Sequence, residues 1–355
     1  MSTLNYIGSK KTLLNFIDYV LKKINGNFKN KNNIRFLDGF SGSGIVSKFV
    51  SEKYNYIVHS NDLEHYSYII CYAILKVPYT QKLEDKINEL NELESTDNKD
   101  YNLITENYSE KGKEKRKFWS TQNAEKADAI IENIETELAN KNITEDEYKF
   151  LLASLLSSVD KVANTASVYG AYLKKYKTSA LKDLELKPIH TNEEIGNYDK
   201  NTNFNADINS KTITDNNYDI VYLDPPYNNR QYSSNYHPLN FIAKYDSSIV
   251  PYGKTGLLEN SNKSNYSISK NVETSFTSLI ENLNTKYILL SYNNEGLMSS
   301  DTIKSILEKK GKTTLYKYQY KKFKSQTTQE DECVYEYLYL CEVGQKGNYL
   351  SYIVK

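Results

Sequence analysis

The chain has 355 residues, enough to bury a large core and to form two domains, and its 45 basic and 45 acidic side chains exclude binding to nucleic acid through overall charge. Cys71, Cys333 and Cys341 form neither a disulfide framework nor a metal-ligand pattern, so we predict a reducing compartment and no metal site. A motif that begins at Asn5 leaves no room for a signal peptide, and no apolar stretch is long enough to span a bilayer, which makes the cytoplasm the expected location.

The chain opens on a short motif followed by an amphipathic helix. The motif is Asn5-Tyr6-Ile7-Gly8-Ser9-Lys10-Lys11, and apolar residues then recur at helical spacing from Leu13 to Ile24. A helix start with free N–H groups and an adjacent lysine makes an anion site, here suited to the carboxylate of an amino-acid group. The alternative is that Lys10 and Lys11 simply belong to a solvated helix start.

Two predicted strands follow, each ending in residues suited to a ligand. A strand over 33–38 leads into Gly39-Phe40-Ser41-Gly42-Ser43-Gly44 and a helix over 45–53. The glycines let the backbone approach a ligand closely, but their spacing is not the dinucleotide fingerprint. A second strand over 56–60 ends at Asn61-Asp62, where an acidic side chain can hold both hydroxyls of a ribose. These elements favour a nucleoside ligand; the alternative is a glycine turn that only shapes the fold.

The pattern then becomes helical and polar between Leu83 and Leu186, which predicts a helical insert over 81–199. This insert interrupts the sheet. Its segment 161–176 combines amide, hydroxyl, lysine and tyrosine side chains, and a basic run occupies 111–117.

An apolar strand over 218–223 stops at Asp224-Pro225-Pro226-Tyr227, because proline cannot pair inside a sheet. Asp224 is therefore expected at the carboxyl end of a buried parallel strand, where open α/β sheets bind ligands. The prolines lack N–H groups and fix a rigid turn, which directs a carboxylate, carbonyl groups and an aromatic ring toward one spot. The alternative is a turn that merely follows a strand.

The groups at this turn suit the exocyclic amine of a base. Its N–H groups can donate to the Asp224 carboxylate and the Pro225 carbonyl, while its ring stacks on Tyr227. The same acceptors stabilise the positive charge that grows on the nitrogen as it attacks an electrophile. No strong base is required before the attack.

The last third of the chain is predicted to complete the sheet. Residues 252–270 are expected to form a mobile surface loop, 286–292 a core strand and 303–309 a helix. Two long strands over 313–323 and 333–343 are expected to form a hairpin at the sheet edge.

Taken together, these motifs resemble the Dam-like N6-adenine DNA methyltransferases, including those of type II restriction–modification systems. The resemblance lies in Asn-Tyr-Ile-Gly-Ser-Lys, Phe-Leu-Asp-Gly-Phe-Ser-Gly-Ser-Gly, Asn-Asp and Asp-Pro-Pro-Tyr, and in the order cofactor half, insert, catalytic strand. It covers roughly residues 3–76 and 203–343.

The resemblance implies a fold, a reaction and partners. The fold is α/β, with the doubly wound mixed sheet of S-adenosylmethionine-dependent methyltransferases, an antiparallel C-terminal hairpin and a helical target-recognition insert. The catalytic domain would span 1–80 and 200–355, and the insert 81–199. S-adenosylmethionine would methylate N6 of an adenine rotated out of double-stranded DNA. The partner would be double-stranded DNA, with either a cognate restriction endonuclease as a second partner or a role as an orphan regulator, and no membrane is implied.

The resemblance also assigns roles to the motif residues. The catalytic residues would be Asp224, Pro225, Pro226 and Tyr227. The cofactor-binding residues would be Tyr6, Gly8, Lys10, Asp38, Gly39, Phe40, Ser41, Gly42, Gly44, Asp62, Leu63, Asp207 and Asp224. Asp38 and the glycine turn would wrap the methionine part of S-adenosylmethionine. Asp62 would bind its ribose, and Leu63 would lie against its adenine. Asp207 would border the cofactor base, unless it is only a surface aspartate.

The predicted DNA contacts lie in two segments. After the catalytic tetrad (residues 224–227) they are Asn228, Arg230 and Tyr232. In the insert they are Asn164, Tyr169, Tyr172, Lys174 and Lys175. The residues after the tetrad either hold the flipped nucleotide or form a loop over the cofactor, with Tyr236 and His237 satisfied inside. Asn228 would orient the tetrad. The insert segment could equally be an ordinary amphipathic helix that runs into a polar loop, and the basic run at 111–117 either touches phosphate or is solvated.

Two other kinds of function are consistent with parts of the pattern. A methyltransferase acting on RNA, on cytosine N4 or on protein glutamine could use a related pocket. A non-catalytic DNA-binding specificity module would need no intact tetrad. The aspartate at the first tetrad position, the N-terminal element and the helical insert favour the adenine enzyme.

Overall fold

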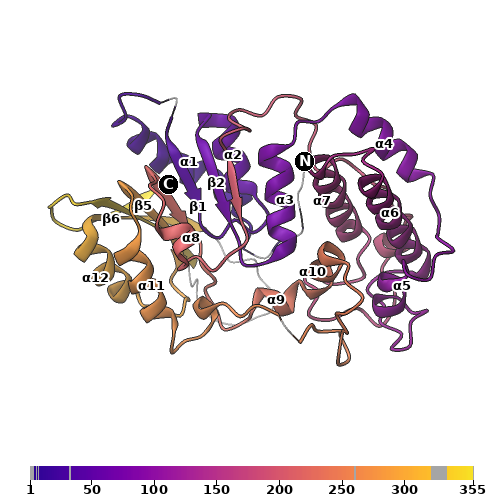
Figure 1. Ribbon diagram of the computed structural model, residues 1–355. Helices are drawn as coiled ribbons and strands as arrows, with labels where there is room; N and C mark the ends of the chain where they lie inside the picture. Colours follow the sequence, from indigo (N-terminus) through magenta and orange to yellow (C-terminus); the bar gives the residue numbers. More distant parts are fainter. Residues whose placement is uncertain are drawn as a thin grey trace.

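The computed structural model describes residues 4, 6, 8–31, 33–259, 261–320 and 334–354. Within these residues the centre is an eight-stranded sheet in the order β3-β2-β1-β4-β5-β7-β6-β8 (Figure 1). The strands are β1 (Arg35–Asp38), β2 (Ile57–Asn61), β3 (Thr202–Phe204), β4 (Ile220–Leu223), β5 (Tyr287–Asn293), β6 (Gly311–Tyr320), β7 (Val334–Val343) and β8 (Leu350–Val354).

The sheet is mixed. The strands from β3 to β5 in the sheet order pair in parallel, whereas β7 is antiparallel to both β5 and β6. The predicted doubly wound mixed sheet with an antiparallel hairpin is therefore confirmed. The predicted place of the hairpin at the sheet edge is wrong, because β8 pairs in parallel with β6 and forms the edge. The predicted strand ends at 321–323 and 333, including Cys333, lie outside the described residues.

Helices cover both faces of the sheet because successive strand side chains point to opposite sides. On β1, Phe36 joins the core that includes α1 (Leu14–Asn25), α2 (Ile45–Tyr54) and α3 (His65–Lys76). The next residue, Leu37, joins the core that includes α11 (Val272–Asn282) and α12 (Ser300–Lys310). The short η1 (Lys10–Leu13) precedes α1, and α8 (Lys211–Thr214) precedes β4.

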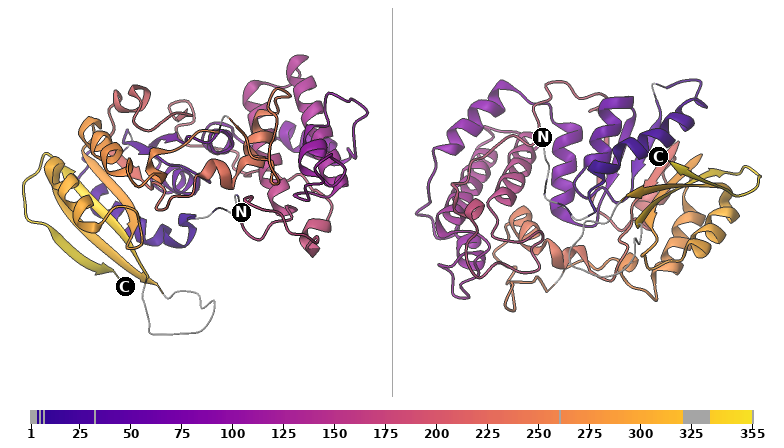
Figure 2. Two further views of the ribbon diagram at one scale, coloured as in Figure 1. Left: turned by 90° about the horizontal axis from the view of Figure 1, so that it is seen from below. Right: turned by 180° about the vertical axis from the view of Figure 1, so that it is seen from behind.

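The predicted insert is helical in its first part. It contains α4 (Gln81–Asn91), α5 (Leu103–Tyr108), α6 (Thr121–Ala139) and α7 (Glu145–Lys161), followed by irregular chain and the short η2 (Thr178–Leu181). Figure 1 shows these helices beyond α3, and Figure 2 shows sheet and insert at opposite ends of the molecule. Helix α7 packs against α3, and one apolar core runs through both parts. The division into a catalytic domain and an insert at 81–199 stays a prediction.

Two further helices connect the sheet to the insert. Directly after β4 come α9 (Tyr232–Asn235) and α10 (His237–Lys244), and α10 packs against both α3 and α7. The short η3 (Asn265–Ser267) follows in the next long connection. The segment after the Asp-Pro-Pro-Tyr turn therefore runs from the strand ends directly to the insert.

The strand order reverses between β1 and β4, which creates a crevice at their carboxyl ends. Asp38 of β1 lies opposite Tyr222 of β4, and the Gly39 N–H donates to the Tyr222 carbonyl at 2.9 Å. A Cβ at Gly39 would lie 2.9 Å from a terminal methyl of Leu223, so a larger residue would have to displace that side chain at this close crossing. Asp38 and Asp224 are thereby brought to the same edge of the sheet.

The structure also bears on disulfides, metal sites and membrane spans. Cys71 and Cys341 are buried and not in a disulfide. Across the described part of the chain, no group of three or more His, Cys, Asp or Glu side chains is placed to hold a metal ion. Among the described helices, none combines the length and apolar character needed to cross a membrane.

Candidate active site

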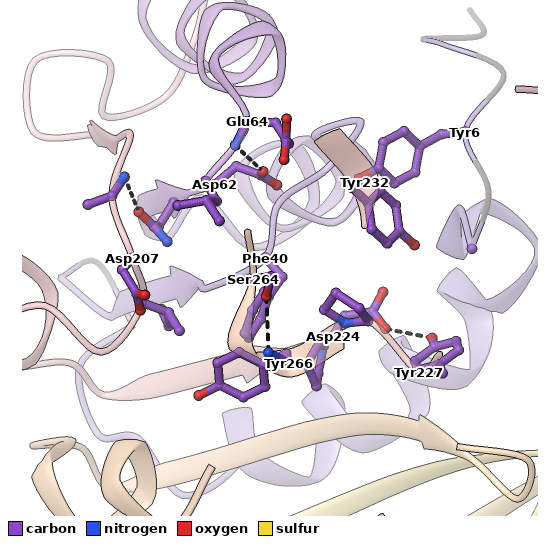
Figure 3. A pocket seen from close by; sticks show the side chains of 17 residues that line it. Tyr6, Phe40, Asp62, Glu64, Asp207, Asp224, Tyr227, Tyr232, Ser264 and Tyr266 are labelled. Carbon is purple, nitrogen blue, oxygen red and sulfur yellow. Dashed lines mark hydrogen bonds between the residues drawn. The ribbon is translucent and has the colours of Figure 1, made fainter. Parts of the chain in front are cut away.

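A cavity that opens to solvent lies at the carboxyl ends of the parallel strands (Figure 3). Figure 3 shows Asp207 on one side of the cavity and Asp224 with Tyr227 on the other. The predicted residues that line it are Tyr6, Gly8, Phe40, Asp62, Leu63, Asp207, Asp224, Pro225, Pro226, Tyr227 and Tyr232. Segments from both ends of the sequence therefore meet in one place.

The Asp224 carboxylate forms the polar centre of one end of the cavity. Its Oδ1 accepts a 2.6 Å hydrogen bond from the Tyr227 hydroxyl and pairs with the Lys10 ammonium at 2.9 Å. Lys10 also donates to the Tyr227 hydroxyl. Both contacts are to Oδ1, so in the described residues Oδ2 is left without a hydrogen-bond partner. Oδ2 is thus the oxygen that can accept a hydrogen bond from a ligand amine.

Opposing effects act on the pKa of this carboxyl. Burial raises the pKa of Asp224, while the charge of Lys10 and the hydrogen bond from Tyr227 oppose that rise. Lys10 is only 3 % exposed and lies 4.8 Å from the centre of the Tyr227 ring. It therefore stabilises the ionised form of Asp224 inside a buried site.

Lys10 lies next to the Asp224 carboxylate. It is not part of the cavity lining, and its ammonium contacts Asp224, Tyr227 and the Gly8 carbonyl. The expected carboxylate-binding helix start is the short η1, in which Lys10 is the first residue. The structure thus shows Lys10 beside the Asp224 carboxylate, and its contact with the cofactor stays a prediction.

Asp38 ends β1 and is almost fully buried. Its Oδ2 accepts hydrogen bonds from the Ser47 N–H at 3.1 Å and the Ser47 hydroxyl at 2.7 Å. Its Oδ1 is buried with no partner among the described residues. Burial, together with the charges of Asp224 and Asp62, raises the pKa of Asp38 to about 7. A buried, unpaired carboxylate oxygen of this kind fits a ligand ammonium group.

The glycine turn after β1 shapes the site more than it lines it. Gly42 has a φ of +50°, and a Cβ there would lie 2.7 Å from the Tyr6 ring. Its N–H donates to Asp62 Oδ2 at 2.7 Å. Gly44, at a φ of +72°, precedes α2 and packs against Cys71. Of the predicted turn residues only Phe40 lines the cavity, whereas Gly39, Ser41, Gly42 and Gly44 hold the turn in place.

The turn after β2 is held by hydrogen bonds from several directions. Asp62 accepts from the Gly42 N–H through Oδ2 and from the Glu64 N–H through Oδ1 at 2.9 Å. The Asn205 amide donates to the carbonyls of Asp62 at 2.9 Å and Leu63 at 3.2 Å. Asp62 and Leu63 are therefore fixed at the cavity wall. Asp207 lies exposed at the rim.

Several cavity residues were missed by the sequence analysis. They are Asn61, Glu64, Ala206, Ile208, Ser264 and Tyr266. The first four adjoin Asp62, Leu63 or Asp207 in the sequence, and this position could have identified them as cavity residues. Burial and the neighbouring Asp62 raise the pKa of Glu64 to about 8.

Ser264 and Tyr266 come from the segment expected to be a mobile surface loop. Gln231 exchanges two hydrogen bonds with Ser264, at 3.1 Å and 2.8 Å. The buried Tyr266 ring packs edge-on against Phe40, with 5.0 Å between ring centres. The prediction of a surface loop is therefore wrong for these residues, because they form a wall of the cavity. No local sequence pattern indicated this long-range contact.

The residues after the tetrad were expected either to hold the flipped nucleotide or to form a loop with Tyr236 and His237 satisfied inside. Tyr236 and His237 are fully buried, and the His237 ring nitrogens face the carbonyls of Ser234 at 2.9 Å and Thr255 at 2.7 Å. These two residues are satisfied inside, as one alternative expected. Tyr232 instead lines the cavity and stacks on Tyr6, with 5.4 Å between ring centres.

The other two predicted contacts after the tetrad lie on the surface. Asn228 and Arg230 are exposed, and Asn228 Oδ1 accepts the Arg230 N–H at 3.0 Å. Asn228 therefore shapes the turn that follows the tetrad. The Arg230 side chain is available to a partner.

The predicted DNA contacts in the insert fall into two groups. Asn164 is fully buried; its amide donates to the carbonyls of Lys117 at 3.0 Å and Leu173 at 2.9 Å. Tyr169 is also buried and donates to Asp160 at 2.9 Å. The structure therefore corrects the prediction for these two residues, because their polar groups are used to hold neighbouring loops together.

The remaining three predicted contacts in the insert are accessible. Tyr172 is half-buried, with its ring 5.2 Å from that of Phe118. Lys174 and Lys175 are exposed in the loop that Asn164 fastens. That loop therefore presents two lysines on the surface of the insert.

Comparisons with known proteins agree with this arrangement. The profile of the D12 class of N6 adenine-specific DNA methyltransferases matches residues 6–306. Type II methyltransferase M.NlaIII of Neisseria lactamica is 40% identical over 350 residues, covering 96% of this chain and 99% of that protein. Type II methyltransferase M.CviAII of Paramecium bursaria Chlorella virus 1 is 37% identical, covering 97% and 100%. M.FokI of Planomicrobium okeanokoites is 37% identical over 95% of this chain and 52% of its own length.

The buried Asp38 generates a prediction for ligand binding. A carboxyl with a raised pKa is protonated below about pH 7 and cannot then pair with a ligand ammonium. We expect the affinity for S-adenosylmethionine to rise as the pH goes from 6 to 8, by up to about tenfold per pH unit below the pKa. Isothermal titration calorimetry across this range measures the change.

A pair of variants isolates the contribution of Asp38. Asp38→Asn should bind weakly and lose the pH dependence, whereas Glu64→Gln, which removes the other carboxyl with a high pKa nearby, should keep the rise through pH 7. A wild-type affinity that stays flat from pH 6 to 8 would count against the role of Asp38.

Proposed function

Because this chain belongs to the D12 class of N6 adenine-specific DNA methyltransferases, we propose that the cavity at the strand ends is its active site. The chain transfers a methyl group from S-adenosylmethionine to N6 of adenine in DNA. The observation that carries the assignment of the site is Asp224, with Oδ1 held by Lys10 and Tyr227 and Oδ2 left for the substrate amine. This arrangement lies in the same cavity as the nucleoside-binding residues.

The residues in and beside the cavity suit the chemical groups of the cofactor. Leu63 and Ile208 offer apolar contacts for the adenine, and Asp62 retains acceptor capacity for the ribose hydroxyls. The unpaired Oδ1 of Asp38 suits the ammonium of the methionine part. When bound, S-adenosylmethionine supplies an electrophilic methyl group on a sulfonium. The exposed Asp207 at the rim stays a proposed contact for the cofactor base.

The chain's own groups prepare the adenine nitrogen for attack. Asp224 Oδ2 and the Pro225 carbonyl accept the N6–H bonds, which turns the nitrogen lone pair toward the methyl group. Lys10 keeps Asp224 ionised, and Tyr227 offers its ring to the base. The nitrogen–carbon bond forms as the carbon–sulfur bond breaks. The surplus N6 proton leaves toward Asp224, whose buried carboxylate is a stronger acceptor than an exposed one.

The target adenine must leave the duplex to reach this buried carboxylate. Rotation out of the helix costs a few kcal/mol, of which stacking on an aromatic ring returns about 1–3 kcal/mol. Tyr227 and Tyr232 line the cavity where the base would stack. We therefore propose that double-stranded DNA binds across the cavity mouth with one adenine extruded.

Two basic loops of the insert are the proposed phosphate contacts. The Asn164 amide fastens the 111–117 loop to the 171–177 loop by bonding the Lys117 and Leu173 carbonyls. Lys113, Lys115, Lys174 and Lys175 are exposed in these loops and take part in no ion pair of the described chain. Their ammonium groups are therefore available to neutralise phosphates.

The relatives extend the proposal to a biological setting. Several proteins similar to this chain are named type II methyltransferases. We propose that this chain likewise protects the DNA site of a cognate restriction endonuclease, and that it works in the cytoplasm, together with that DNA. The insert over 81–199 would recognise the site.

Replacing Asp224 tests the proposed function. Asp224→Ala should lower methyl transfer to DNA by at least about 10²-fold, because it removes the acceptor for the developing charge, while S-adenosylmethionine still binds. The measurement is incorporation of labelled methyl groups into DNA, followed by digestion to nucleosides and mass spectrometry. Asp215→Ala, at an exposed aspartate before β4, is the matched control.

The product identifies the reaction directly. We expect N6-methyladenine from the wild type and from Asp215→Ala, and its loss in Asp224→Ala. Methylated cytosine or RNA as the product, or full activity in Asp224→Ala, would refute the proposed site. Sequencing that detects modified bases then maps the methylated DNA site.

The basic loops give a separate prediction about salt. Lys174→Gln/Lys175→Gln should weaken DNA binding and reduce the slope of log K against log salt concentration by about 0.9 for each phosphate that is no longer neutralised. Fluorescence anisotropy at several salt concentrations measures the slope. Lys29→Gln/Lys31→Gln, in the loop before β1 at the amino ends of the strands, should leave it unchanged. An equal effect in both pairs would disprove the assignment.

A further inference from the structure

The loop after α10 exposes two large apolar side chains close together. Val250 is 73 % exposed and Tyr252 is 47 % exposed, two positions apart in the sequence. Lys254 is exposed in the same loop. Isolated apolar residues are common on protein surfaces, but neighbouring ones on a fixed loop indicate a contact surface.

The tip of this loop has a fixed backbone. Tyr252 and Leu257 exchange two backbone hydrogen bonds of 2.9 Å, which close a short hairpin-like turn. Gly253 and Gly256 within the turn both have positive φ values, of +66° and +77°. The turn therefore presents Tyr252 at its base and Lys254 near its apex.

Buried side chains of the insert hold the backbone of this turn by hydrogen bonds. The buried Arg116 guanidinium donates to the Gly253 carbonyl at 2.8 Å and the Pro251 carbonyl at 3.4 Å. The Tyr108 hydroxyl donates to the Gly256 carbonyl at 2.7 Å. The exposed tip is thus held rigidly, which reduces the entropy lost when it binds a partner.

The tip lies between the active site and the basic loops. Val250 and Tyr252 line a hollow together with Asn240 and Glu64. Glu64 also lines the active-site cavity, so the two hollows share a wall. On its other side the tip is bonded to Arg116, which belongs to the basic 111–117 loop.

The chemistry of this surface fits a DNA duplex better than a second protein. Apolar side chains that enter a duplex sit between base steps, while neighbouring cations contact the phosphates. Lys244 lines the same hollow as Tyr252, together with Glu64 and Glu259, while Lys254 is exposed at the tip itself. An apolar tip flanked by lysines therefore matches stacked bases bordered by phosphates.

We propose that Val250 and Tyr252 form a wedge that enters the duplex beside the target adenine and keeps its neighbours apart while the adenine is in the cavity. The inference rests on the proposed function and adds the element that opens the duplex. Arg116 is a positioning residue for this wedge, because it holds the loop backbone and has no direct access to the DNA.

The test compares two DNA duplexes that carry the mapped methylation site. In one the target adenine is paired with thymine; in the other it lies opposite an abasic position, where less energy is needed to extrude it. Single-turnover methyl transfer by Tyr252→Ala should be about tenfold slower or more on the paired duplex, the range expected when one stacking interaction is removed. On the abasic duplex the loss should be less than about twofold.

Matched variants complete the experiment. Tyr252→Phe keeps the ring and should retain wild-type rates. Tyr198→Ala removes another exposed tyrosine, 51 % exposed and just before β3 at the amino ends of the strands, and should have no effect. Affinity for S-adenosylmethionine and the thermal unfolding midpoint should match the wild type in each variant, which shows that the change acts on DNA.

Three results would overturn the wedge. The first is an equal loss of rate on the paired and abasic duplexes, and the second is no loss in Tyr252→Ala or in the double variant Val250→Ser/Tyr252→Ala. The third is a difference in sedimentation between the wild type and the double variant without DNA, which would mean that the tip binds a second copy of the chain. Failure of the proposed function looks different, because then the wild type itself yields no N6-methyladenine.

Discussion

The contact between the Lys10 ammonium and the Asp224 carboxylate is the interaction on which the active site depends. Parallel strands that end at one edge bring Asp38, Asp62 and Asp224 into a buried crevice, and burial raises the pKa of all three. In the described residues Lys10 is the cation in contact with any of them. It favours the ionised form of the carboxylate that must accept the adenine amine, whereas Asp38 is left close to half-ionised near pH 7.

The rest of the molecule serves to bring an adenine to that carboxylate. Helix α10 follows the catalytic turn and packs against both α3 and α7, so the sheet, the insert and the loop that carries Tyr252 are joined in one core. Buried polar groups then fix the surface loops: Arg116 holds the loop at 250–256, and Asn164 holds the two basic loops together. Rigid loops beside a preformed cavity reduce the entropy that is lost when the protein binds a distorted duplex.

The sequence was sufficient to predict the central sheet and the residues at its strand ends. Apolar runs that stop at Asp38, Asp62 and Asp224 identify the strands and their shared edge, and the structure places two of these aspartates in the cavity lining and Asp38 beside it. The strand β8 was missed because its residues are mostly exposed and show no alternation. Asn164, Tyr169 and Tyr266 were expected at the surface but are buried, because tertiary contacts decide whether a polar or aromatic side chain points inward. A sequence pattern gives composition and spacing, and it does not show which tertiary partners these side chains meet.

The pH dependence of methyl transfer in Lys10→Met tests the central claim most directly, with Lys11→Met as the neighbouring control. Single-turnover rates at saturating S-adenosylmethionine should rise with pH as Asp224 ionises. Loss of Lys10 removes the charge that opposes the raised pKa of Asp224, so this rise should move to higher pH in Lys10→Met and stay in place in Lys11→Met. A pH profile of Lys10→Met that coincides with that of the wild type would contradict the account.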